Sequence, residues 1–447
     1  MFQKVLIANR GEIAVRIIQA CRDLGIISVA VYSEADREAL HAQIADEAVC
    51  IGPARAADSY LNMDNIISAA LASGCQAIHP GFGFLSENPD FAERITQAGL
   101  AFIGPTAATI RLMGDKSEAK RNAIAAGVPV ALGTDGPLRD FDEAISEAER
   151  IGYPVMLKAA SGGGGKGIRV AESVKDLKDA YDSASAEAIA NFGDGRLYME
   201  KYIHNPRHIE VQILGDNYGN VVHLFERECS VQRRHQKLIE ESPSAFVTPE
   251  LREKMTSAAV ALAKRVGYRN AGTIEFLVDN DRNFYFCEMN TRIQVEHPVT
   301  EEVTGVDLVC EQLRVAAGEP LSFKQEDLTI RGHAIECRIN AEDPSRNFAP
   351  CPGTLVSLHL PGGPGVRVDS AAYQGYKIPP FYDSMIGKLI VYGAVREQAI
   401  VRMRRALAEM LFEGVVTATD YQMHILCSKA FVEANFNVNS IANGDFD

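Results

Sequence analysis

The sequence predicts an α/β region followed by α+β regions, and three observations support this fold class. Up to about residue 110, short apolar segments alternate with helical segments, which is typical of a parallel, doubly wound sheet. From about residue 130, strand-like segments flank turns and glycine loops, so hairpins are expected. A chain of 447 residues has room for about three domains at roughly 150 residues each.

The first region begins with a buried strand at residues 4–8 (KVLIA). A helix follows, because Ile13, Ile17, Cys21 and Leu24 recur at helical spacing before a stop at Gly25. Further strands are expected at 28–32, 77–79 and 101–103, and a helix at 64–72. The first strand–helix turn reads NRGE rather than GxGxxG, so no dinucleotide site is predicted there.

The later regions mix strands and helices. Between about 130 and 200, strand-like PVMLKAA and GIRVA flank a glycine loop, a helix is expected at 173–190, and LYMEKYI is another strand. From about 205, we expect the strands HIEVQIL and VVHLFERE, a helix at 249–266 and the hairpin GTIEFLV/NFYFCEMN. After 330 the chain is β-rich with turns at PCPG, PGGPG and PP, and a helix is expected at 396–411.

Composition excludes several classes of protein. The net charge of −14 and the lack of a Lys/Arg-rich run argue against a nucleic-acid partner. The nine cysteines are scattered without CxxC spacing, so neither a zinc site nor a redox motif is predicted. No run of about 18 apolar residues occurs, and the apolar run at the N-terminus is too short for a signal peptide. We therefore expect a cytoplasmic protein without a membrane partner.

The segment SGGGGKG is the first candidate binding motif. Gly162, Gly164 and Gly167 satisfy GxGxxG, but the β-branched IRVA follows where a dinucleotide motif needs a helix. A loop between two strands can instead bring bare backbone amides to phosphate oxygens. Lys158 precedes this loop, and Lys116 opens a helix whose N-terminus favours anions. The alternatives are a hairpin tip without a ligand and lysines that are only solvated.

The second candidate motif is the polar segment from Glu288 to Glu296. Glu288 and Asn290 share one face of a strand, and Glu275 on the partner strand can oppose them, which suits Mg²⁺. If the chain stays extended up to His297-Pro298, that face continues through three further polar residues, Arg292, Gln294 and Glu296. Arg292 could then hold a planar oxyanion and Glu296 could remove its proton. The alternative is the polar outer face of an ordinary hairpin.

Two further basic sites have a simple structural alternative. RRHQK provides Arg233, Arg234, His235 and Lys237, which could bind a ribose and an anion or could be a solvated edge. Arg338 alternates with acidic and amide residues on the strand AIECRIN, where a lone arginine is usually structural.

Taken in order, these motifs resemble those of one family, the biotin carboxylases. The segments that carry the resemblance are IANRGEIAVRI, HPGFGFLSEN, FIGP, LMGDK, KAASGGGGKG, MEKYI, PRHIEVQI, ERECSVQRRHQK, EMNTRIQVEHPVTE, GHAIECRINAEDP and YDSMIGKL, and they span essentially the whole chain. The resemblance implies an ATP-grasp fold. It implies a Rossmann-like N-terminal domain at 1–114, an ATP-grasp domain at 115–329 with a mobile lid at about 131–203, and a C-terminal biotin carboxylase domain at 330–447.

The resemblance also implies a role for each site residue. The ATP phosphates would be bound by Lys116, Lys158, Gly162, Gly163, Gly164 and Gly165. Adenine would contact Glu200, Lys201 and Ile203, and the ribose His208, Gln232 and His235. Mg²⁺ or Mn²⁺ would bind Glu275, Glu288 and Asn290. Bicarbonate would contact Lys237, Arg292, Gln294, Val295 and Glu296, with Glu296 as the base. Biotin would meet Arg338 and Phe82, where the family commonly has tyrosine in place of Phe82.

The implied reaction uses ATP and bicarbonate to form carboxyphosphate and then carboxylates biotin. None of the eleven methionines precedes a lysine, as the family's biotin-bearing site requires, so we expect a separate biotin carboxyl carrier protein. The remaining expectations are a homodimer, carboxyltransferase subunits as partners, and a place in acetyl-CoA carboxylase, which makes malonyl-CoA for fatty acid synthesis in the bacterial cytoplasm or plastid stroma. The alternatives are a two-subunit pyruvate carboxylase or another acyl-CoA carboxylase, another ATP-grasp ligase, and a non-catalytic ATP-binding regulator.

Overall fold

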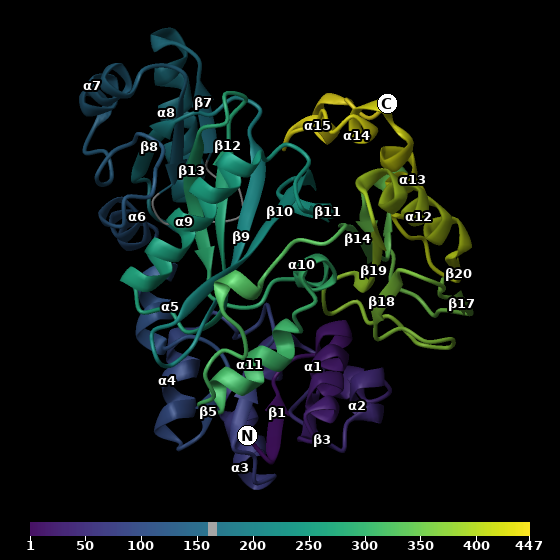
Figure 1. Ribbon diagram of the computed structural model, residues 1–447. Helices are drawn as coiled ribbons and strands as arrows, with labels where there is room; N and C mark the ends of the chain where they lie inside the picture. Colours follow the sequence, from purple (N-terminus) through teal and green to yellow (C-terminus); the bar gives the residue numbers. More distant parts are fainter. Residues whose placement is uncertain (160–167) are drawn as a thin grey trace.

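The computed structural model describes residues 1–159 and 168–447, and its N-terminal part is built on a parallel sheet (Figure 1). The strand order is β3-β2-β1-β4-β5. The strands are β1 (Lys4–Ile7), β2 (Ile27–Tyr32), β3 (Glu47–Cys50), β4 (Ala77–His79) and β5 (Ala101–Phe102). Along β1, Val5 and Ile7 belong to one apolar core and Leu6 to another, so both faces are covered. The predicted doubly wound layer is confirmed, although β3 was not predicted.

Two helices of the N-terminal part, α1 (Gly11–Asp23) and α3 (Met63–Ala72), begin and end close to the predicted positions. The others are α2 (Leu40–Ile44), α4 (Pro89–Gln97), α5 (Ala107–Gly114) and α6 (Lys116–Ala125), of which only the start of α6 at Lys116 was predicted. Ile13, Ile17 and Cys21 on α1 are buried in the core, as their spacing predicts. Asp115 caps α6 by accepting from the backbone N–H groups of Ser117 and Glu118.

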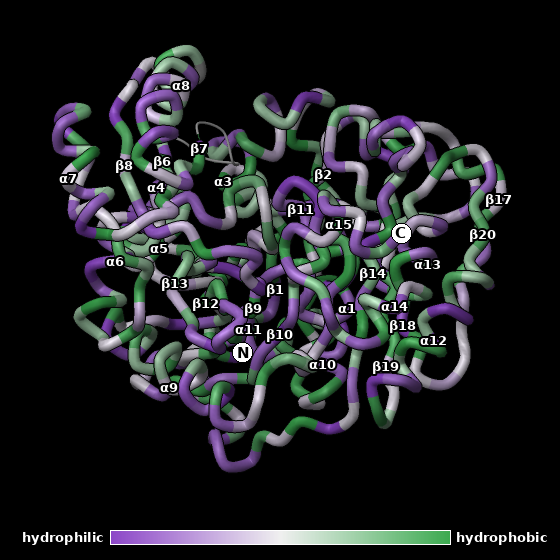
Figure 2. Tube along the Cα trace, turned by 90° about the horizontal axis from the view of Figure 1, so that it is seen from above, coloured by the Kyte–Doolittle hydropathy of each residue, from purple (hydrophilic) through white to green (hydrophobic). Residues whose placement is uncertain are grey.

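A three-stranded antiparallel sheet forms a separate lobe at the upper left of Figure 1. Its order is β7-β6-β8, from β6 (Val155–Ala159), β7 (Ile168–Ala171) and β8 (Leu197–Lys201). Two helices, α7 (Phe141–Ile151) and α8 (Val174–Phe192), pack on it. Seen from above, these helices lie at one edge of the molecule, and apolar and polar positions alternate along them (Figure 2). The hairpin that flanks the glycine loop is confirmed, while Gly162, Gly163, Gly164 and Gly165 lie outside the described residues.

The largest sheet has eight strands, and all neighbouring strands are antiparallel. Its order is β13-β12-β9-β10-β11-β14-β19-β18. The strands are β9 (Arg207–Gly215), β10 (Val221–Arg233), β11 (Gln236–Ser242), β12 (Asn270–Val278), β13 (Phe284–Asn290), β14 (His333–Asn340), β18 (Val366–Ser370) and β19 (Met385–Gly393). Because β11 pairs with β14, the sheet continues across the expected boundary at 329/330, and Lys237 on β11 and Arg338 on β14 belong to neighbouring strands.

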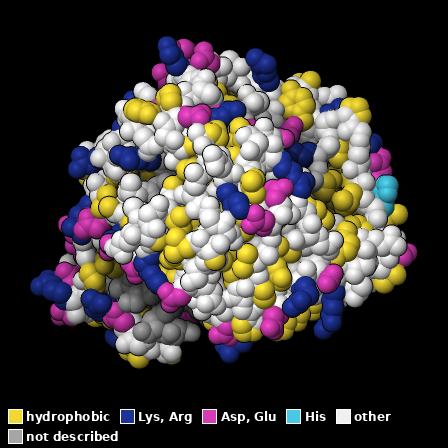
Figure 3. All heavy atoms as spheres, turned by 90° about the horizontal axis from the view of Figure 1, so that it is seen from below, with side chains coloured by type: hydrophobic (Ala, Val, Ile, Leu, Met, Phe, Trp, Pro, Cys, Tyr) yellow, Lys and Arg dark blue, Asp and Glu magenta, His cyan; other side chains and the backbone are white. Residues whose placement is uncertain are grey.

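Helices pack around this sheet and at the C-terminal end of the chain. They are α9 (Pro249–Arg265), α10 (His297–Thr304), α11 (Leu308–Ala316), α12 (Arg396–Glu409), α13 (Thr419–Cys427), α14 (Lys429–Val432) and α15 (Ser440–Asn443). Two small antiparallel pairs complete the fold, β15 (Glu342–Asp343) with β16 (Ala349–Pro350) and β17 (Ser357–His359) with β20 (Leu411–Glu413). None of the described helices is long and apolar enough to cross a membrane. On the face shown in Figure 3, basic and acidic side chains are interspersed.

The expected extended strand from Glu288 to Glu296 is wrong beyond Asn290. Strand β13 ends at Asn290, residues 291–296 form turns, and His297 begins helix α10 instead of ending a strand. Pro298 stands in the first turn of that helix, where proline costs no hydrogen bond. The alternation of faces is therefore lost, and Gln294 and Glu296 are buried side by side with Ile293.

Candidate active site

A row of three carboxylates crosses the eight-stranded sheet at the candidate site. Glu275 on β12 lies directly opposite Glu210 on β9 and Glu288 on β13. Like charges directly opposite on neighbouring strands repel each other. Glu210 and Glu275 are buried, whereas Glu288 is exposed. Such a row is stable only with cations beside it.

Lys237 on β11 is the central cation of the site. Its Nζ lies 2.7 Å from Glu210 Oε2, 3.0 Å from Glu275 Oε1 and 2.6 Å from Glu296 Oε1. Burial alone would lower the pKa of Lys237, but these carboxylates outweigh burial and hold its pKa well above the ordinary value. The ammonium is therefore charged at neutral pH and joins the carboxylate row to Glu296.

Glu296 is held between two cations. Its Oε1 accepts from Lys237, and its Oε2 accepts from Nη2 of Arg338 at 3.0 Å. Burial would raise its pKa, but Lys237, Arg338 and Arg227 hold the pKa well below the usual range. The side chain is therefore an ionised carboxylate with only 2% of its surface exposed. It can accept a proton from a substrate that reaches it.

Arg338 on β14 contacts two acids at once. Its Nε donates to Glu240 Oε1 at 2.6 Å, while Nη2 donates to Glu296. Burial raises the pKa of Glu240 to about 7, with Arg338 opposing that effect. The guanidinium is fixed by both contacts, so its remaining N–H groups have a defined direction.

A second arginine, Arg227 on β10, supports the site from within the sheet. The side chain is fully buried, and Nε donates to Glu210 at 2.6 Å. Its Nη2 donates to Oε1 of Gln294 at 2.6 Å, and Nε2 of Gln294 donates to Glu275 at 2.8 Å. Further bonds reach Gln212, Thr273 and Thr300. Arg227 thus orients both a carboxylate of the row and the predicted bicarbonate ligand Gln294.

Arg292 meets an acidic residue from the N-terminal part of the chain. Its Nε donates to Glu87 Oε2 at 2.9 Å, and Nη2 donates to Asn290 Oδ1 at 2.7 Å. Glu87 Oε1 also accepts from the backbone N–H of Thr291 at 2.9 Å. Glu87 thereby fastens the start of the 291–296 segment to the loop that follows β4. The amide nitrogen of Asn290 faces Glu275 at 2.9 Å, so its oxygen points to Arg292.

The residues predicted to bind metal fit a hard cation. Desolvation and the charge of Glu275 raise the pKa of Glu288, because the two carboxylates lie directly opposite each other on neighbouring strands. Two carboxylates and one amide are the ligand types that Mg²⁺ selects. His208 adds a ring nitrogen 3.0 Å from Glu275 Oε2. Asn290 would need its amide turned to offer oxygen.

The predicted phosphate and adenine residues meet in the lobe of β6–β8. Lys158 Nζ donates to Glu200 Oε2 at 2.5 Å, and Lys120 lies 3.5 Å from Glu200 Oε1. Lys120 was not predicted from the sequence. Lys116 is exposed at the start of α6, and its charge lowers the pKa of Glu288, so it faces the carboxylate row.

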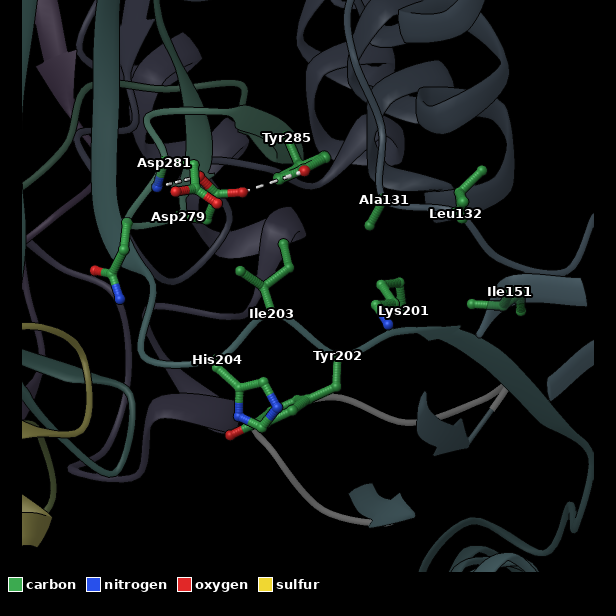
Figure 4. A pocket seen from close by; sticks show the side chains of 11 residues that line it. Ala131, Leu132, Ile151, Lys201, Tyr202, Ile203, His204, Asp279, Asp281 and Tyr285 are labelled. Atoms are coloured by element: carbon green, nitrogen blue, oxygen red, sulfur yellow. Dashed lines mark hydrogen bonds between the residues drawn. The ribbon is translucent and has the colours of Figure 1, made fainter. Parts of the chain in front are cut away.

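Lys201 and Ile203 line a recess of about 390 Å³ where β8 leaves the lobe. In Figure 4 the side chain of Ile203 lies near the middle of the recess, with Tyr285 on the opposite wall. The ammonium of Lys201 donates to the carbonyls of Gly152 at 2.9 Å and Tyr153 at 2.8 Å. Its charged end is therefore bound to backbone carbonyls, and the N–H groups of Lys201 and Tyr202 also donate to backbone carbonyls.

The other predicted residues lie at different depths. Gln232 is buried on β10 directly opposite Lys237, whereas His235 is exposed in the turn before β11. Phe82 is partly buried against the core of the N-terminal sheet, and its carbonyl accepts from the Asn9 side chain at 2.7 Å.

Comparisons with known proteins place the chain in a family. The model of the biotin carboxylase N-terminal domain matches residues 1–110, and that of the C-terminal domain matches 336–443. The model of the carbamoyl-phosphate synthase L chain ATP-binding domain matches 115–324. Biotin carboxylase 1 of Bacillus subtilis is 56% identical over 446 residues, which cover 100% of this chain and 99% of the relative. The chain belongs to the biotin carboxylase family. It is an ATP-dependent carboxylating ligase with the ATP-grasp fold.

Other biotin carboxylases and related subunits are equally similar. A pyruvate carboxylase subunit of Methanothermobacter thermautotrophicus is 56% identical over 431 residues, which cover 96% of this chain and 88% of the relative. A solved structure of the biotin carboxylase domain dimer of Hydrogenobacter thermophilus 2-oxoglutarate carboxylase contains MgADP, ADP and bicarbonate. It matches with a TM-score of 0.94 and 51% identity over 100% of this chain and 99% of that one.

The structure brings together most of the residues that the sequence singled out. A bonded cluster joins Lys237, Glu275, Asn290, Arg292, Gln294, Glu296 and Arg338. Sequence reasoning missed the side chains that support this cluster, namely Glu87, Glu210, Arg227, Glu240 and Lys388. Glu87 and Arg227 lie inside the quoted motifs HPGFGFLSEN and ERECSVQRRHQK, but their residue type and spacing do not single them out.

Proposed function

We propose that this biotin carboxylase carboxylates the biotin of a separate carrier protein, as the first half-reaction of an acetyl-CoA carboxylase. The observation that carries the proposal is the ionised Glu296, held between Lys237 and Arg338 at the end of the carboxylate row. A proton acceptor therefore lies beside two cations that can bind anions and beside a pair of carboxylates that suits a metal ion. The product of the complete enzyme would be malonyl-CoA for fatty acid synthesis.

In the first step, MgATP would lie between the lobe of β6–β8 and the eight-stranded sheet. Glu200, Lys201 and Ile203 would contact adenine, and His208, Gln232 and His235 the ribose. The phosphates would meet Lys116, Lys158 and the loop containing Gly162, Gly163, Gly164 and Gly165. Glu275 and Glu288, with Asn290 beside them, would hold Mg²⁺ or Mn²⁺. The metal supplies positive charge that neutralises the phosphate oxygens as the γ-phosphoryl group transfers.

Bicarbonate would bind between Lys237, Arg292, Gln294 and Val295. Glu296 would take its proton while the carbonate oxygen attacks the γ-phosphorus, and ADP leaves with the electrons of the broken P–O bond. The cations that keep Glu296 ionised also lower its basicity, so proton transfer and attack are expected in one concerted step. The product is carboxyphosphate.

Carboxyphosphate would then break down to CO₂ and phosphate, and the phosphate would remove the N1 proton of biotin. Arg338 would stabilise the resulting enolate oxygen, since its guanidinium is already fixed by Glu240 and Glu296. The enolate attacks CO₂ through N1 to give carboxybiotin. Phe82 would pack against the apolar part of biotin, without the hydroxyl that tyrosine would offer.

The final acyl acceptor is a second, separable part of the proposal. The high identity to a pyruvate carboxylase subunit makes pyruvate the alternative acceptor. Because a carboxyltransferase subunit selects the acceptor, the carboxylase half-reaction is the same in both cases. Identification of the carboxyltransferase that co-purifies with the chain distinguishes them: one specific for acetyl-CoA supports the first, and one specific for pyruvate supports the alternative.

The half-reaction itself is tested by steady-state ATP cleavage. We expect ATP hydrolysis that depends on bicarbonate and Mg²⁺ and is stimulated by free biotin. A protein that binds ATP but shows no bicarbonate-dependent cleavage would overturn the proposal. Sedimentation of the purified chain tests the expected homodimer in parallel.

A further inference from the structure

Two consecutive backbone carbonyls in the 291–296 segment are each bound by a buried side chain. The carbonyl of Gln294 lies 2.8 Å from Nδ1 of His297, which must therefore carry the proton. The carbonyl of Val295 accepts from Nζ of Lys388 at 2.8 Å. His297 and Lys388 are both fully buried. The two carbonyls of this turn are thus directed into the protein interior.

This arrangement fixes the direction of the neighbouring N–H groups. The C=O and N–H of a trans peptide point in opposite directions, and both peptides of this turn are trans. The N–H groups of Val295 and Glu296 therefore point away from His297 and Lys388. Within residues 1–159 and 168–447, neither N–H donates to another protein group. Two adjacent free N–H groups form a concave site for an anion.

Lys388 is placed by parts of the chain that lie far apart in sequence. It is on β19, and its ammonium lies 3.4 Å from Glu12 Oε2 on α1 and 4.0 Å from Asp369 Oδ2 on β18. Figure 1 shows α10, which follows the turn, between β14–β19 and α1. An ammonium has three donors, so one can serve the Val295 carbonyl while the acids balance its charge.

We propose that Lys388 and His297 are positioning residues that aim the Val295 and Glu296 N–H groups at an oxygen of bicarbonate. The inference rests on the proposed function and assigns a task to two side chains that do not touch the substrate. The donors would stabilise the charge that concentrates on the bicarbonate oxygens during proton loss. The same turn carries the Glu296 carboxylate, so orientation of its backbone also places the proton acceptor.

The test compares Glu12→Gln with the double variant Glu12→Gln/Lys388→Met. Both variants remove the Glu12 carboxylate that pairs with Lys388, and only the second removes the donor to Val295. Burial already raises the pKa of Glu12 to about 7, so its neutral replacement is mild. We expect the double variant to raise the KM for bicarbonate at least about tenfold over Glu12→Gln, because a small displacement of a binding group has large effects. The KM for ATP and the bicarbonate-independent ATPase should stay within about twofold.

His297→Phe tests the second carbonyl without changing charge, and should also raise the bicarbonate KM with little effect on ATP. Arg396→Met is the control for general damage, because Arg396 pairs with buried Glu241 and does not touch the turn. Folded variants with a normal bicarbonate KM overturn the inference, as does an Arg396→Met protein whose bicarbonate KM rises as much as that of the double variant. If the unmodified protein lacks bicarbonate-dependent ATP cleavage, the proposed function itself has failed.

Discussion

Replacing Glu296 by glutamine removes the proposed proton acceptor while keeping the shape of the side chain. The carboxylate accepts from Lys237 at 2.6 Å and from Arg338 at 3.0 Å, and an amide can accept from only one of them. Loss of a positioned base typically lowers the rate about 10²–10⁴-fold, which corresponds to about 3–5 kcal/mol in the barrier. We expect this loss in kcat for bicarbonate-dependent ATP cleavage, with ATP affinity changed less than about threefold.

The assay follows ADP release at saturating ATP with and without bicarbonate, and ATP binding is titrated separately. Glu302→Gln is the matched control. Glu302 lies further along α10, and its ion pair with Arg367 at 3.4 Å does not reach the site. In Glu296→Gln, the amide hydrogens of the new side chain would face a cation, which is expected to lower the free energy of unfolding by about 1–3 kcal/mol. Thermal unfolding of both variants therefore checks that they are folded.

Two results would refute this reasoning in different ways. Wild-type turnover by a folded Glu296→Gln protein shows that the residue accepts no proton. A raised KM for bicarbonate with unchanged kcat shows that Glu296 only contributes to binding. The second result would also remove the argument for a concerted proton transfer.

Four further predictions concern binding, catalysis and stability. Arg338→Ala should impair carboxyl transfer to free biotin more than bicarbonate-dependent ATP cleavage, and equal losses in the two assays would count against its role at the enolate. Phe82→Tyr should tighten biotin binding slightly, as measured by the KM for free biotin, if the hydroxyl matters; an unchanged KM dismisses it. Arg227→Met leaves Glu210 buried without its main partner and should lower the free energy of unfolding by about 3–5 kcal/mol in urea titrations; a loss below about 1 kcal/mol contradicts this. Despite burial, the charge of Arg396 and the hydrogen bond with His333 lower the pKa of Glu241 to about 2. Its folded pKa lies below the unfolded value, so about 3 kcal/mol of stability is present above about pH 4.5 and is lost as pH falls towards 2. The free energy of unfolding of Glu241→Gln should therefore fall less steeply than that of the unmodified protein as the pH drops below about 4.5. An unchanged pH dependence refutes the assignment.

The sequence predicts those helices and strands that a short local pattern of apolar residues identifies by itself. The hairpin of β12 and β13 was predicted from the strand-like segments GTIEFLV and NFYFCEMN on either side of a polar turn, and its register places Glu275 opposite Glu288 as expected. The first N-terminal strand was predicted from its short apolar run, and α1 from apolar residues at helical spacing. Pairing over long distances was not predictable in this way, so the joining of β11 to β14 was missed.

The 291–296 segment shows why a local pattern can mislead. Its alternation of polar and apolar residues is that of a half-exposed strand, yet Gln294 and Glu296 are buried. Their burial depends on Arg227 and Lys237, which lie far earlier in the chain. Without those partners the segment would have to expose its polar side chains, and an extended strand would be the better prediction.

The cations of the site share one physical property, which is that each already neutralises or orients a polar group of the same cluster. Lys237 touches three carboxylates, and Arg227, Arg338 and Arg292 each hold at least one acid or amide. Charges are therefore paired before any substrate arrives, which avoids the cost of an unpaired buried ion. In the proposed function, anionic substrates would exchange partners with Glu275 and Glu296 and would not enter an uncompensated cationic pocket.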